Sequence, residues 1–122
     1  MGKKRILFVD NRPEFMHQPV LRLRLEGYEV DESSSGEDGL SRLRETDYDL
    51  LMLDADLPAS DGWGTIRAVR EDPSLHEMKV IVFMAPQGET GKLVLVPVDG
   101  ELRRPFNMAQ MIEAVEKVIG AP

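Results

Sequence analysis

Four side chains that could perform chemistry stand just after short apolar runs of this sequence. They comprise two carboxylates, a carboxamide and a guanidinium: Asp10, Asn11, Asp54 and Arg104. Neighbouring carboxylates repel each other, so a cluster of them calls for a cation, a shared proton or an arginine. Mg²⁺ is the natural cation, because it is a hard ion usually held by one or two carboxylates. A carboxylate beside Mg²⁺ can accept a phosphoryl group, since the metal screens the repulsion of an incoming anion.

This chemistry requires the side chains to meet, because isolated aspartates commonly serve as turn or cap residues. Three runs of consecutive apolar residues, 6–9, 50–53 and 80–84, predict strands buried on both faces. Such strands belong to a parallel sheet covered by helices on each side. Two weaker strands are predicted at 28–32 and near Leu102. Ligands of such sheets bind outside the carboxyl ends of the strands, where all four side chains converge.

Helical spacing of apolar residues and end signals predict four helices. They cover 14–26, a segment from Ser35 through Leu43, a segment from Asp61 to before Pro73, and a segment from Asn107 to Gly120. Pro19 predicts a late start or a kink in the first helix. The segment 85–101 is turn-rich and then β-branched, which disfavours a regular helix. The resulting alternation of strands and helices predicts an open, doubly wound α/β sheet.

Length and composition restrict the function further. The chain has 122 residues, a net charge of −7 and no cysteine, which predicts one domain over 1–122 without disulfides or a thiolate zinc site. The acidic balance argues against direct, charge-driven binding to nucleic acid. Neither a membrane span nor a secretory signal is visible, so we expect a cytoplasmic protein.

Several motifs together resemble the receiver domain of two-component response regulators. They are the run 6–9 with Asp10, the segment 49–54 followed by Leu57-Pro58 and Asp61-Gly62, the segment 80–85, and Arg104-Pro105-Phe106. The resemblance covers the whole chain. It implies a flavodoxin-like (CheY-like) five-stranded parallel sheet of order 2-1-3-4-5 with helices on both faces. The fourth helix of that fold is expected to be short, irregular or missing here.

The resemblance also implies roles for individual residues. Asp54 matches the phosphoacceptor, and Asp10 matches one of two acidic residues that hold Mg²⁺ with Asp54. The backbone carbonyl of Asp56 matches a third metal ligand, and Pro105 matches a proline that often follows a cis peptide bond. The phosphoryl group would come from a histidine kinase or a phosphotransfer protein. The domain would act on a downstream protein as a monomer or weak homodimer, and not as an enzyme.

Four positions depart from the family pattern. Asn11 replaces a second acidic residue; its amide can face a metal-bound water but adds no charge, so Mg²⁺ should bind weakly. Met84 replaces a Thr or Ser, and its thioether cannot donate a hydrogen bond to a phosphoryl oxygen. Glu101 replaces the switch aromatic, and Arg104 replaces a lysine, which keeps the charge but changes its shape. Conformational readout should therefore be altered.

Two further hypotheses follow from these departures. Arg104, or Arg12 beside the acidic turn, could lie against Asp54 and partly replace the metal. The domain could instead be a binding or dimerisation module that signals without phosphate. An enzyme is a third reading, because Asp54-Ala55-Asp56 is similar to the nucleophile motif of haloacid-dehalogenase-type phosphatases. That motif expects Thr or Val where Leu57-Pro58 stands, and those enzymes need a longer chain.

Overall fold

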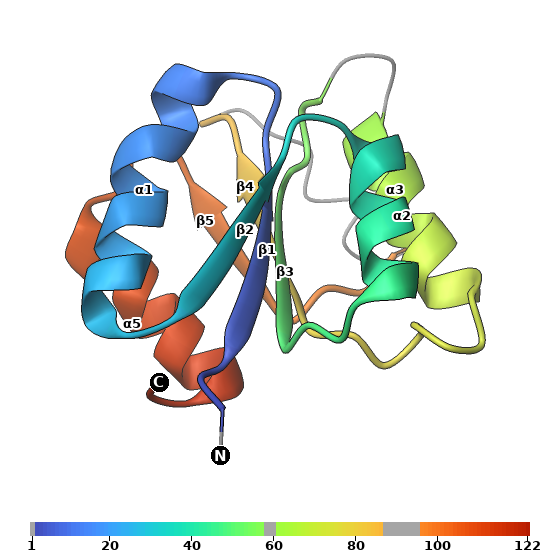
Figure 1. The fold of residues 1–122 in the computed structure, drawn as a ribbon. Coiled ribbons are helices and arrows are strands. Elements are labelled where there is room, and N and C mark those ends of the chain that lie inside the picture. The colour runs from blue at the N-terminus through green and yellow to red at the C-terminus, as the bar shows by residue number, and fades with distance from the viewer. Residues whose placement is uncertain (1, 58–60, 87–95) are drawn as a thin grey trace.

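A computed structural model describes residues 2–57, 61–86 and 96–122. Five parallel strands form one sheet of order β2-β1-β3-β4-β5 (Figure 1). Their bounds are β1 Arg5–Val9, β2 Glu29–Ser33, β3 Leu50–Asp54, β4 Val80–Met84 and β5 Gly100–Arg103. The predicted sheet and strand order are confirmed.

The described residues form four helices, two on each face of the sheet (Figure 1). Helices α1 (Pro13–Glu26) and α5 (Met108–Ile119) cover one face, and helices α2 (Gly36–Glu45) and α3 (Asp61–Glu71) cover the other. This arrangement explains the continuous apolar runs, because every residue of β3 and β4 is buried. The edge strand β2 instead mixes exposed and buried positions.

The core divides into two clusters according to the direction of the strand side chains. Successive residues of a strand point to opposite faces of the sheet. Phe8 and Phe83 therefore join the cluster under α1 and α5, which also holds Met111. Leu7 and Val82 join the other cluster, under α2 and α3. The two clusters fix the strand register and, with it, the level at which each strand ends.

Helix α1 corrects one sequence expectation. It begins at Pro13, so the predicted late start is wrong, and Pro19 lies in its interior. Pro19 is buried on the same stripe as Met16, Val20 and Leu23. Burial of this apolar stripe against the sheet outweighs the backbone hydrogen bond that a proline removes.

The caps predicted at Ser35 and Asn107 are confirmed. The Ser35 hydroxyl accepts a hydrogen bond from the Asp38 backbone N–H at 3.1 Å and starts α2. At the start of α5, the Asn107 side chain accepts from the Gln110 N–H at 2.7 Å. The Gln110 side chain accepts in return from the Asn107 N–H at 2.8 Å. This capping box fixes where α5 begins, just beyond the residues that follow β5.

The expectation of a short, irregular or missing fourth helix concerns the connection between β4 and β5. Most of that connection, residues 87–95, lies outside the described residues. Its described flanks, 85–86 and 96–99, are not helical.

Among residues 2–57, 61–86 and 96–122, no helix combines the length and apolar character needed to cross a bilayer.

Candidate functional site

Asp10 and Asp54 lie side by side at the carboxyl edge of the sheet. Val9 pairs with Leu53 in the register of β1 and β3, so the two aspartates that follow these residues are level. Their exposed fractions are 0% and 1%. Two carboxylates are thus held together out of water, an arrangement that is unfavourable unless positive charge compensates for it.

Two arginines supply that charge. Arg12, in the turn after β1, forms an ion pair with Asp10 at 3.3 Å and a second ion pair with Asp54. Arg104, after β5, contacts Asp10 at 3.3 Å and Asp54 at 3.6 Å. We call these four residues the arginine–aspartate cluster. The contact with Asp54 that the sequence suggested for Arg104 or Arg12 is made by both.

Backbone groups orient the carboxylates within this cluster. The Arg12 N–H donates to Asp10 Oδ1 at 3.1 Å, and the Asp56 N–H donates to Asp54 Oδ1 at 2.8 Å. Both arginines contact the other Asp54 oxygen, Oδ2. The exposed Asp56 carboxylate accepts from the Ala85 N–H at 2.9 Å, which ties the end of β3 to the end of β4.

The electrostatics of the cluster follow from burial and charge balance. Burial raises the pKa of Asp10, and the nearby charge of Asp54 raises it further. Hydrogen bonds and the charge of Arg12 act in the opposite direction. Two guanidinium groups therefore balance two carboxylates, although desolvation still opposes ionisation of Asp10.

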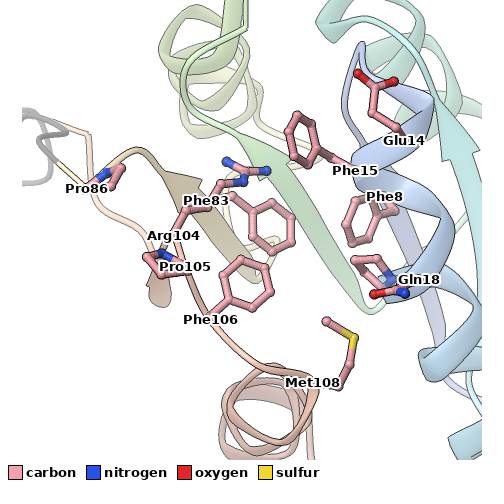
Figure 2. A pocket seen from close by; sticks show the side chains of 11 residues that line it. Phe8, Glu14, Phe15, Gln18, Phe83, Pro86, Arg104, Pro105, Phe106 and Met108 are labelled. Carbon is pink, nitrogen blue, oxygen red and sulfur yellow. The ribbon is translucent and has the colours of Figure 1, made fainter.

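Aromatic rings support both arginines. The Arg12 guanidinium carbon lies 4.3 Å from the centre of the Phe15 ring, and that of Arg104 lies 5.5 Å from the Phe15 and Phe83 rings. Figure 2 shows the Arg104 guanidinium between these two rings. Cation–π contact at such distances favours these positions of the charges. In the sequence, Phe15 fits the apolar pattern of the helix predicted over 14–26, and its place one turn after Arg12 was the signal that it could support the guanidinium.

A pocket of about 440 Å³ opens next to Arg104, between α1 and the start of α5 (Figure 2). Phe8, Phe83 and Phe106 form its floor in a row, with ring centres 5.0 and 5.5 Å apart. The Arg104–Pro105 peptide bond, on the pocket's border, is cis. Sequence reasoning missed this pocket, because its aromatic residues come from three distant segments.

The remaining candidate residues are spread around the cluster. Asn11 is exposed in the turn between β1 and α1. Met84 is buried at the end of β4, and its carbonyl accepts from the Arg104 N–H at 2.8 Å. Glu101 is exposed on the edge strand β5, where it lies 4.0 Å from Arg103. No hydroxyl or aromatic side chain therefore stands at positions 84 and 101.

The described residues form a doubly wound parallel α/β sheet with a buried acid pair at its carboxyl edge, and comparison with known proteins identifies the family. The model of the response regulator receiver domain matches residues 6–116. The chain belongs to this family.

Individual relatives agree with this assignment. The transcriptional regulatory protein PcoR of Escherichia coli is 32% identical over 118 residues, which cover 95% of this chain and 51% of PcoR. The chain spans about half the length of PcoR and about half the length of two other curated relatives, ResD of Bacillus subtilis and GtcR of Aneurinibacillus migulanus. The crystal structure of a putative response regulator from Chloroflexus aurantiacus has a TM-score of 0.89 at 26% identity, covering 97% of this chain and 98% of the other.

A further solved structure has a magnesium ion coordinated in its active-site cleft. It is the receiver domain of the sensor histidine kinase PA1611 from Pseudomonas aeruginosa, with a TM-score of 0.88 and 24% identity over 98% of this chain and all of the other. In the present chain, the described residues contain no group of three or more acidic or histidine side chains placed to hold a metal. Both buried carboxylates already contact guanidinium groups. The cluster in this arrangement does not fit Mg²⁺.

Proposed function

We propose that the chain is the receiver domain of a cytoplasmic two-component phosphorelay, in which Asp54 accepts a phosphoryl group from a histidine kinase or a phosphotransfer protein. One observation carries this proposal. In a chain of the receiver family, Asp54 ends a central strand directly beside Asp10 and between two arginines. The domain then passes a signal to a downstream protein and has no substrate turnover of its own.

The contacts of Asp54 support Oδ2 as the reacting atom. Asp54 Oδ1 is held by the backbone N–H of Asp56, whereas Oδ2 is held, among the described residues, only by the side chains of Arg12 and Arg104. Oδ2 is therefore the oxygen that can be released to act as the nucleophile, when Arg12 moves away from it. Oδ2 attacks the phosphorus of a phosphohistidine, the phosphorus–nitrogen bond breaks, and its electron pair returns to the imidazole. The product is an acyl phosphate on Asp54. Arg104 can then bind the phosphoryl oxygens through its guanidinium fork, a favourable geometry for a phosphate.

We further propose that Mg²⁺ binds weakly and that the readout differs from that of an ordinary receiver. Asp10 and Asp54 are the candidate carboxylate ligands, with the Asp56 carbonyl as a third ligand and Asn11 acting through a water. The arginines already neutralise the carboxylates, which reduces the attraction of a metal. Met84 lacks the hydroxyl that would donate to a phosphoryl oxygen, so a phosphoryl group has fewer contacts through which to move the following loop.

The test is incubation with acetyl phosphate followed by intact mass spectrometry. The wild type should gain the mass of one phosphoryl group, and Asp54→Asn should not gain it. The matched control is Asp47→Asn, because Asp47 is an exposed carboxylate in the loop before β3. An adduct that persists in Asp54→Asn, or that never forms in the wild type, contradicts the proposal. Sustained release of phosphate from monoesters would instead favour the phosphatase reading.

A second candidate function is a binding module that signals without phosphate. The aromatic pocket beside Arg104 favours it, because Phe15 at the rim is 44% exposed and the floor is apolar. Exposed aromatic side chains around a concave site are typical of binding surfaces. This reading predicts that the wild type forms no adduct with acetyl phosphate and that Asp54→Asn leaves partner binding unchanged.

A further inference from the structure

We infer that Arg12 is a tethered cation that binds the Asp10–Asp54 pair in place of a metal ion, and that Mg²⁺ can bind this pair only after Arg12 has left it. This inference deepens the proposed function and rests on it for its meaning in signalling. The metal competition itself can be measured without any phosphorylation.

The first support is that Arg12 bridges both carboxylates. Its Nε contacts Asp10 Oδ1 at 3.3 Å, and its Nη2 contacts Asp54 Oδ2. Its own backbone N–H also donates to Asp10 Oδ1 at 3.1 Å. One side chain therefore occupies the space between two buried carboxylates, which is where an ion shared by both would have to lie.

The second support is that the two arginines are held differently. The Arg104 side chain is 21% exposed, its backbone N–H donates to the Met84 carbonyl at 2.8 Å, and its guanidinium lies near the buried Phe83 ring. The Arg12 side chain is 37% exposed, and the ring beneath it belongs to Phe15, which is itself 44% exposed. Phe15 also contacts Arg104, but Arg104 has the buried Phe83 ring as a second support, whereas Arg12 has only Phe15 among the described rings. Arg12 can therefore move into solvent, while Arg104 keeps its contact with Phe83.

The third support is the charge balance. With both arginines in place, the cluster has two positive and two negative groups. Addition of Mg²⁺ to this neutral, buried cluster would leave two uncompensated positive charges at short range. Departure of Arg12 removes one positive charge and exposes oxygens of both carboxylates. Arg12 and the metal are thus mutually exclusive, and Arg12 sets the concentration of Mg²⁺ that the site requires.

The experiment is a calorimetric Mg²⁺ titration of the whole chain, with thermal unfolding in Mg²⁺ as a second measurement. Arg12→Gln should bind Mg²⁺ at least about tenfold more tightly than the wild type, since one contact-distance cation has been removed. Its unfolding temperature should rise with Mg²⁺ more than that of the wild type. The control is Arg42→Gln, because Arg42 is an exposed arginine paired with Asp38 on α2. Its Mg²⁺ affinity should equal that of the wild type.

A second variant tests the same idea with less disturbance of the fold. Arg12→Lys keeps a positive charge but replaces the fork that reaches both carboxylates with a single ammonium group. Its Mg²⁺ affinity should lie between those of the wild type and Arg12→Gln. The inference is overturned if the wild type binds Mg²⁺ as tightly as Arg12→Gln, or if Arg12→Lys, folded, binds it no better than the wild type. Failure of Asp54 phosphorylation would refute the proposed function alone and leave the metal competition standing.

Discussion

The start of α3 presses against the backbone that carries Asp54, and this contact makes a sharp prediction about Gly62. A methyl group added at Gly62 would lie 2.5 Å from the carbonyl oxygens of both Asp54 and Ala55. These are backbone atoms at the end of β3, so no side-chain rotation can relieve the contact. Gly62→Ala must therefore move either α3 or the strand end that holds the proposed phosphoacceptor.

Gly64 provides the matched control, because it lies on the same helix and a methyl group there would meet open space. Gly64→Ala should stabilise the fold by about 0.8–1 kcal/mol through helix propensity. Gly62→Ala carries a similar propensity gain together with an overpacking cost of about 1–3 kcal/mol or more. The difference between the two variants is that cost. Contact with two backbone atoms puts it at the upper end, near ~3 kcal/mol, or about 12 °C in unfolding temperature for a chain of this length.

Urea and thermal unfolding followed by circular dichroism measure this difference directly. Gly62→Ala should also form less acetyl phosphate adduct than Gly64→Ala under conditions where both are folded, because the displaced backbone moves Asp54. Equal stability of the two alanine variants would refute the reasoning, since it would mean that α3 and β3 separate at no cost.

Two further predictions concern the stability of the fold. Burial and the hydrogen bond to Asp31, 2.5 Å long, raise the pKa of Tyr48 to about 12, so the stability it contributes is complete below pH 10 and disappears as the pH rises from 10 to 12. The difference in unfolding free energy between the wild type and Tyr48→Phe should be constant below pH 10 and decline above it; an unchanged difference would contradict the assignment. Asn107→Ala should lower the stability by ~1 kcal/mol, because it removes the acceptor of the capping box. Gln110→Ala removes only the return bond, so thermal unfolding should show a smaller loss for it, and the reverse order would be inconsistent with this cap.

Much of the architecture was readable from local pattern. In the runs 6–9, 50–53 and 80–84, apolar residues do not alternate with polar ones, because helices cover both faces of these strands. Burial on both faces is therefore visible in the sequence as a continuous apolar run. The caps at Ser35 and Asn107 were readable for a similar reason, since a cap joins residues three positions apart. The expected late start at Pro19 failed because packing against the sheet, a tertiary effect, outweighed the local preference of proline.

The sequence by itself determined that Asp10 and Asp54 follow buried strands and stand at the same edge of the sheet, because the carboxyl ends of parallel strands share one edge. The sequence offered Arg12 or Arg104 as candidates to neutralise them, and only the tertiary structure decided that both do so. Arg12 is 42 residues from Asp54, and Arg104 is 94 residues from Asp10, so no periodicity or local motif links these partners. The arginines reach the aspartates because of the level at which each strand ends and because of the aromatic rings that lie beneath each guanidinium. Both features depend on how the whole sheet and its helices pack.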